Sequence, residues 1–387
     1  MKKLSLLPFL FIFLFSAFLP SILNAQELIQ DDITTVKAKV IDIVDKKIKN
    51  VPGTDITSEY QTLKVEIISG TDTGKQVIVE NDYLSLKKDE VFYLKITKRG
   101  EDGMVMYSVS EPYRINAILF FIILFVLLVL IFGGIQGIRG LVSLSGSLVL
   151  ILYVLLPGIL QGYSPIIISL AVSSLIIILG SYVTHGFNKT TTSAVIGMIF
   201  TVILTGALAY FAVHWSRLSG FSDEEAVYLN FDTRGSIDFV GLLLGGMLIG
   251  LLGVLYDVAI GQAISVEELN HVAPHLPRKT IFTRAVRIGR EHIGALVNTL
   301  AIAYVGVSLP LLLLYVHSSN SPIGQTINRE IFATEIIRTM IGSIGLVIAV
   351  PITTWIAVLI LMRKNKGVDE KTLETEENAI KHFHHHH

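Results

Sequence analysis

The residue of this sequence with the clearest chemical potential is Asp257, an acidic side chain within the otherwise apolar segment 239–262. Spacings of three and four residues bring helical side chains onto one narrow stripe, and four glycines share such a stripe with Asp257. These glycines are Gly246, Gly250, Gly253 and Gly261. Glycine lets another helix approach closely, and an ionisable group within a span is costly unless it faces protein or water. We therefore expect the stripe to face inward, toward a partner helix or a passage.

The chemistry predicted for Asp257 is the binding of a cation or a proton. The alternatives are a structural pair with a basic or amide partner, and simple exposure at the inner membrane interface. Asn298 is a second polar side chain within an apolar segment, residues 294–316, where it is aligned with Gly294 and Ala301. An amide inside a span usually pairs across helices or lines a hydrated path.

Residues 336–362 form the last apolar segment, which also carries small and polar residues on one face. This stripe contains Glu335, Thr339, Gly342, Ala349 and Thr353, with Arg338 beside it. Small residues at such spacing are typical of closely packed helices in membranes. We interpret the Ser, Thr and Gly positions as packing positions, among them Gly342.

The segment after the glycine stripe has polar residues for which a binding role must be weighed. Ser265 and Glu268 have the spacing of a capping box, which predicts a short cytoplasmic helix that ends before Pro274. Glu268, His271 and His275 could be imagined as metal ligands, but Pro274 disrupts the helical geometry between them. We therefore predict no metal site there and no cofactor elsewhere.

The basic segment 278–292 carries Arg284, Arg287 and Arg290 at every third position beside apolar residues. This pattern is typical of an amphipathic helix at the membrane interface whose cations face lipid phosphates. A lining for an anionic substrate is the alternative.

The composition indicates an integral membrane protein. Of 387 residues, 51% are hydrophobic and only 16% are charged, and the mean hydropathy is +0.62; soluble domains carry about 25% charged residues. The chain contains no cysteine, which excludes disulfides, thiol nucleophiles and thiolate metal sites. No motif of a hydrolase, metalloprotease or nucleotide-binding enzyme is present, and no basic, aromatic-rich stretch suggests a nucleic-acid partner. We therefore predict that the protein is not an enzyme.

The chain is predicted to contain four parts. Residues 1–25 resemble a secretory signal peptide, with two lysines, an apolar run and a small residue at Ala25; an uncleaved anchor is the alternative. Residues 26–112 alternate apolar and polar residues in about five short strands, which predicts a small extracytoplasmic β-barrel or sandwich, OB-like in kind. Residues 113–365 form the transmembrane domain, and residues 366–387 form a cytoplasmic tail that ends in a purification-tag remnant.

Seven apolar segments in the transmembrane domain are each about long enough to cross a bilayer core of ~30 Å. They lie near 115–134, 140–160, 165–184, 193–213, 238–261, 294–316 and 336–362. With the N-terminal domain outside, most basic loop residues fall on the cytoplasmic side, as the positive-inside rule requires. An odd number of spans is needed for this topology, so we predict about seven spans after the signal peptide.

Several motifs resemble the YibE/F-like family of bacterial membrane proteins. They are GLLGVLYDVAIGQA at 250–263, RIGREHIGALVNTLAIAY at 287–304, THGFNK at 184–189, DEEA at 223–226 and TMIGSIGLVIAVP at 339–351. The resemblance implies a multi-span protein for which transport is a supposition based on architecture. It points to seven positions, namely His185, Asp257, Gln262, Glu268, Arg290, His292 and Asn298. Most fall toward the cytoplasmic side, so a shared polar cluster is expected there.

These observations predict a transporter or channel for an ion or small solute in the bacterial inner or plasma membrane. Asp257 would bind the ion or proton, Asn298 and Gln262 would supply neutral polar groups, and His185 or His292 would titrate near neutral pH. The alternative is a scaffold or envelope-assembly factor without transport activity, which docks protein partners through its β-domain. The glycine stripes also suit a homo-oligomer. The substrate and the direction of movement cannot be read from the sequence.

Overall fold

The computed structural model describes residues 32–50, 57–82, 84–99, 104–317 and 322–362. The predicted signal peptide and the whole of the predicted tail lie outside these residues. The chain divides into two compact units, Met1–Phe125 and Val126–His387.

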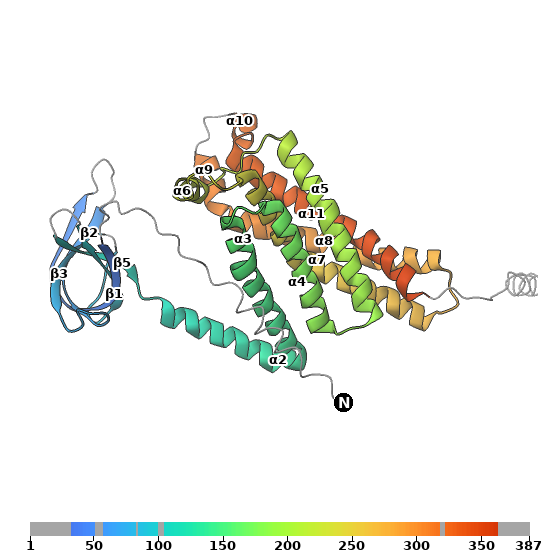
Figure 1. Ribbon diagram of the computed structural model, residues 1–387, viewed down its shortest axis with the longest axis horizontal. Coiled ribbons are helices and arrows are strands. Elements are labelled where there is room, and N and C mark those ends of the chain that lie inside the picture. Colours follow the sequence, from blue (N-terminus) through green and yellow to red (C-terminus); the bar gives the residue numbers. More distant parts are fainter. Residues whose placement is uncertain (1–31, 51–56, 83, 100–103, 318–321, 363–387) are drawn as a thin grey trace, which may run out of the picture. The chain divides into compact units, whose positions relative to one another are not determined.

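The first unit contains a five-stranded antiparallel sheet that curls into a half-barrel (Figure 1). Its strands are β1 (Asp32–Asn50), β2 (Thr57–Ile67), β3 (Gln76–Asn81), β4 (Val91–Lys98) and β5 (Val105–Pro112), in the order β3-β2-β1-β4-β5. The long strand β1 pairs with β4 through its first half and with β2 through its second half, and register shifts after Val40 and Ile43 separate its segments. The predicted small all-β domain is therefore present.

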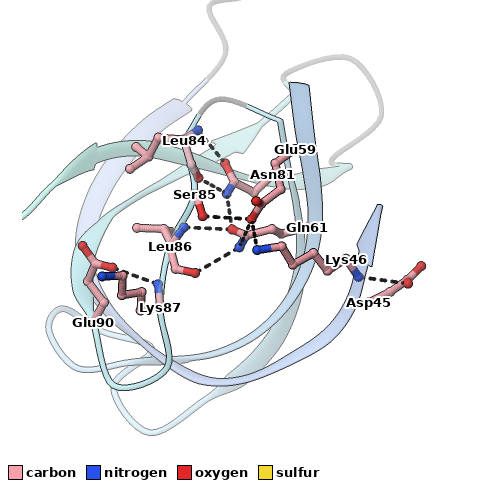
Figure 2. A network of polar contacts seen from close by, with 10 residues as sticks. All are labelled: Asp45, Lys46, Glu59, Gln61, Asn81, Leu84, Ser85, Leu86, Lys87 and Glu90. Carbon is pink, nitrogen blue, oxygen red and sulfur yellow. Dashed lines mark hydrogen bonds and ion pairs between the residues drawn. The ribbon is translucent and has the colours of Figure 1, made fainter. Parts of the chain in front are cut away.

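Alternation of apolar and polar residues builds the core of the half-barrel. Successive strand residues point to opposite faces, so Ala38 and Val40 on β1 meet Leu63, Val65 and Ile67 on β2 in a fully buried cluster. A polar network fixes the connection between β3 and β4 to this sheet (Figure 2). Within it, the buried Gln61 side chain donates to the Leu86 carbonyl at 3.0 Å and accepts from the Leu86 amide at 2.9 Å.

The second unit is helical. Its boundary at Val126 lies inside the first helix, α2. The elements of this unit are α2 (Ile115–Leu150), the π-helical turn η1 (Ile151–Leu155), α3 (Leu156–Leu160), α4 (Pro165–His185), α5 (Lys189–Trp215), α6 (Glu224–Asp232), α7 (Phe239–Val272), α8 (Arg278–Val307), α9 (Leu309–His317), α10 (Ile323–Ile327) and α11 (Glu330–Leu361). The apolar helix α7 is central, because it packs against α4, α5, α8 and α11.

Five helical stretches in the described residues are long and apolar enough to cross a membrane, and a sixth candidate is the bent pair α8 and α9. The predicted segments 115–134 and 140–160 both belong to one stretch of 46 residues, Ile115–Leu160. That stretch is broken at Gly134, where φ is 53° and ψ is −136°, a combination that glycine adopts readily. The structure thus supports a membrane protein with five to six apolar helices, and seven spans stay a prediction.

One predicted boundary is wrong. The capping-box spacing predicted that a short helix begins at Ser265, but α7 continues without interruption to Val272. The Ser265 hydroxyl donates to the Gly261 carbonyl at 2.8 Å, within the helix, instead of capping a new one. The predicted end before Pro274 is confirmed.

Candidate functional site

Apart from Gly250, which approaches Tyr304 of α8, the glycine stripe of α7 faces away from the other described helices of its own chain. Asp257 is exposed, as are Gly246, Gly250, Gly253 and Gly261. The opposite face of α7 supplies Leu251, Leu255 and Ala259 to the buried core. A Cβ added at Gly246, Gly253 or Gly261 would meet no atom within 4 Å. Within the single chain the stripe is thus largely uncovered, and the expectation that it faces a partner helix or a passage stays a prediction.

Asp257 has no hydrogen bond or ion pair with any residue that the structure describes. The preceding residue, Tyr256, connects α7 to α4, since its hydroxyl donates to the Gly180 carbonyl at 3.3 Å. The imidazole of His185, at the end of α4, lies 5.9 Å from the Tyr256 ring. His185 is therefore close to the Asp257 segment through Tyr256, without contacting the carboxylate.

Gln262 lies on the other side of α7, where it is buried between helices. Its side chain is 4% exposed, and its amide oxygen accepts a hydrogen bond of 2.7 Å from the Thr354 hydroxyl on α11. Its amide nitrogen packs on Gly289 of α8, where an added Cβ would lie 2.5 Å away. Gln262 thus joins three helices, and the structure does not bring it together with Asp257.

The remaining positions have no hydrogen bond or ion pair with one another among the described residues, and the expected cytoplasmic cluster stays a prediction. Glu268, on the last turns of α7, and Arg290, His292 and Asn298, on α8, are all exposed. In the described part of the chain, no group of three or more His, Asp or Glu side chains could hold a metal ion. The seven predicted positions are thus distributed over several faces of the helical unit.

Close helix contacts occur at glycines, as membrane packing favours. A Cβ at Gly342 would lie 3.2 Å from Leu300, which places α11 tightly on α8. Gly197 and Gly345 make the α5–α11 contact, because added Cβ atoms would lie 2.6 Å from Thr353 Oγ1 and 2.7 Å from Thr205 Oγ1. The sequence carried this signal as small-residue stripes, but it did not identify which glycines are in contact.

A second polar group within the helices was not selected as a site from the sequence. On α11, Arg338 Nη1 lies 3.2 Å from Glu335 Oε1. Ser308, between α8 and α9, donates to Glu335 Oε2 at 3.5 Å. The signal that could have identified this group is the presence of opposite charges three residues apart at the beginning of an apolar segment.

Comparison with known proteins gives one match. The family model described as YibE/F-like protein matches residues 121–363, which include every helix from α4 to α11. No curated protein and no solved structure matches the chain significantly.

Proposed function

This chain belongs to the YibE/F-like family, and on that premise we propose that it is a multi-pass transporter or channel for an ion or small solute. Asp257 would be the group that binds the ion or proton. The proposed location is the bacterial inner or plasma membrane, with the β-domain extracytoplasmic and the C-terminus cytoplasmic, which agrees with the positive-inside rule.

The observation that carries this proposal is the unpartnered carboxylate on the open face of α7. An acidic side chain within a span is costly, up to about 2.5–3.5 kcal/mol at its centre on insertion scales, and such residues usually face a cavity or a partner. Asp257 has no polar partner in the described chain, and its glycine neighbours leave open space along the helix. A water-filled path or a bound cation along this face would supply the missing stabilisation.

We further propose that a second copy of the chain covers the glycine stripe and completes this path. Helices with small residues at such spacing can approach closely, and Gly246, Gly253 and Gly261 leave room for a facing helix. Within this scheme, His185 and Asn298 would lie beside the path, whereas we assign Gln262 to helix packing. The paired stripes would place the two Asp257 side chains near the interface.

The test is ion flux into proteoliposomes that contain the purified full-length protein. Entrapped pyranine reports proton movement, and radioactive sodium reports Na⁺ uptake. The proposal predicts that Asp257→Asn lowers the wild-type flux by about tenfold or more, as expected when an essential binding group loses its charge. Glu267→Gln, an exposed carboxylate on the same helix, is the matched control and should behave as wild type. A wild-type flux that Asp257→Asn leaves unchanged would contradict the proposal.

One observation favours the alternative, a scaffold that docks partners through the β-domain. The half-barrel is a compact unit with its own buried core. Its strand order β3-β2-β1-β4-β5 suits an OB-like domain, a class of fold used for binding. This alternative predicts that the cellular phenotype of a deletion strain is rescued by Asp257→Asn, but not by a chain that lacks residues 32–112.

A further inference from the structure

Glu335 and Arg338 are opposite charges in the apolar helix α11, and their side chains are only 25% and 29% exposed. They lie five and eight residues after the start of α11 at Glu330, which is about 8–12 Å along the helix axis. The pair therefore lies near one end of the span. Ionisable residues at such depth are usually associated with function, because burying a charge pair rarely adds stability.

The helical structure between α8 and α9 is interrupted beside this pair. Helix α8 ends at Val307 and α9 begins at Leu309, with a bend of 65° between them. Pro310 has no amide N–H, so it cannot donate to the Gly306 carbonyl one turn earlier, which explains why the helix breaks here. Ser308 lies at the break with its hydroxyl on Glu335. Broken helices line binding sites in many membrane proteins, because their freed backbone groups need polar partners.

Helix α7 passes beside another polar residue of α8, Tyr304. Tyr304, one turn before the break, has its hydroxyl beside α7, where a Cβ added at Gly250 would lie 3.1 Å away. We call Ser308, Glu335 and Arg338, together with Tyr304 one turn before the break, the α8-break cluster.

The hydrogen bonding of the α8-break cluster is incomplete on both charges. Arg338 Nε is fully buried and has no acceptor among the described residues. Among the described residues, Glu335 Oε2 has only the 3.5 Å contact with Ser308, at the limit for a hydrogen bond. A structural ion pair would be expected to satisfy its buried donors, since an unsatisfied one costs about 1–3 kcal/mol.

We propose that the α8-break cluster binds a zwitterionic group, with acidic oxygens on Arg338 and an ammonium on Glu335. A cation alone would add a partner to Glu335 and leave Arg338 Nε without an acceptor, and an anion alone would satisfy Nε and add nothing to Glu335 Oε2. A zwitterion supplies both a donor and acceptors and keeps the site neutral, which matters where charge is poorly solvated. Two sources share this chemistry, a small solute such as phosphoethanolamine and the headgroup of an ethanolamine phospholipid.

This site is separate from Asp257, so its binding does not depend on the proposed transport. The test is calorimetric binding of phosphoethanolamine, inorganic phosphate and ethanolamine to the full chain in phosphatidylglycerol nanodiscs. In a parallel experiment, native mass spectrometry measures retention of phosphatidylethanolamine against phosphatidylglycerol in mixed-lipid nanodiscs. If phosphoethanolamine binds about tenfold more tightly than inorganic phosphate or ethanolamine, the ligand is a small solute. If phosphatidylethanolamine is retained selectively over phosphatidylglycerol, the ligand is a lipid headgroup.

The deciding variant is Glu335→Gln combined with Arg338→Gln, which removes both charges and leaves no lone buried charge. It should abolish whichever preference the wild type shows, while its elution on size exclusion stays unchanged. Arg329→Gln, an exposed position before the same helix, is the control and should keep the preference. The proposal is overturned if neither zwitterion is preferred, or if the double variant keeps the wild-type preference.

Discussion

The Thr354 hydroxyl donates a hydrogen bond of 2.7 Å to the amide oxygen of Gln262, which connects α11 to α7 inside the buried core. The same hydroxyl is also 2.7 Å from the Val350 carbonyl in its own helix. The Thr354 hydroxyl therefore has two acceptors, Gln262 and Val350. The amide nitrogen of Gln262 packs against Gly289 of α8. This contact fixes the relative positions of three helices beneath the Asp257 face.

The first prediction concerns this contact. Gln262→Leu and Thr354→Val should each lower the stability of the folded protein, and the double variant should lose less than the sum of the two. We expect a coupling of about 0.5–2 kcal/mol, the range of hydrogen bonds between membrane helices. Reversible unfolding in mixed detergent micelles measures it. Strict additivity would show that the two side chains do not interact.

The second prediction separates packed from open glycines on one helix. Gly289→Ala would place a methyl group 2.5 Å from Gln262 Nε2 and 2.6 Å from Val350, so it should lower the thermal stability. Gly294→Ala meets no atom within 4 Å and should leave it unchanged or slightly raised, because alanine favours helix. Melting of both variants in the same detergent makes the comparison, and equal behaviour would contradict the packing of α7 on α8.

The third prediction concerns acid and the β-domain. A hydrogen bond from the Lys46 ammonium to Glu59, with smaller help from Ser85, lowers the pKa of the Glu59 carboxyl below its ordinary value of 4.5. Because the folded pKa is the lower one, its stabilisation is present above the ordinary value and is lost as pH falls through the lowered pKa. We expect protection of the Leu86 amide from hydrogen exchange, corrected for intrinsic rates, to decrease in that window.

Glu59→Gln should remove this pH dependence, because the amide does not titrate. Glu80→Gln, an exposed position on the neighbouring strand β3, is the control and should keep the wild-type profile. If the protection of the Leu86 amide depends on pH in the same way in wild type and Glu59→Gln, another group causes the loss of protection.

The fourth prediction tests the topology with single cysteines, which is straightforward because this sequence has none. Thr71→Cys, exposed in the β-domain, should react with a membrane-impermeant maleimide on intact cells from which any outer membrane has been permeabilised. Lys279→Cys, exposed at the start of α8, should react only after the inner membrane is opened. The reverse pattern would invert the proposed orientation.

The sequence predicted the sheet and the apolar helices well, because each rests on a local period. Alternation at Ala38, Val40, Leu63 and Val65 corresponds to the buried face of the half-barrel. Helical spacing likewise placed Gly246 to Gly261 on one stripe with Asp257.

The direction of that stripe could not be predicted, and the reason is physical. In water, the apolar face of a helix turns inward, but in lipid both the packed face and the lipid-facing side are apolar. Leu251 and Leu255 are buried in the helical unit, whereas Ile203 on α5 is exposed, although all are equally apolar. The α8-break cluster was missed for a related reason, since the approach of Ser308 to Glu335 depends on a bend that only the fold reveals.

The most direct test of the central claim asks whether water reaches the Asp257 face in the membrane. Gly253→Cys and Gly261→Cys, which flank Asp257, would be treated in proteoliposomes with a charged, membrane-impermeant thiol reagent. Ile203→Cys, an exposed apolar position on α5, is the lipid-facing control. The account predicts labelling at 253 or 261 and none at 203. If all three positions resist the charged reagent but react with a hydrophobic maleimide, the face of Asp257 is dry and the transport proposal is wrong.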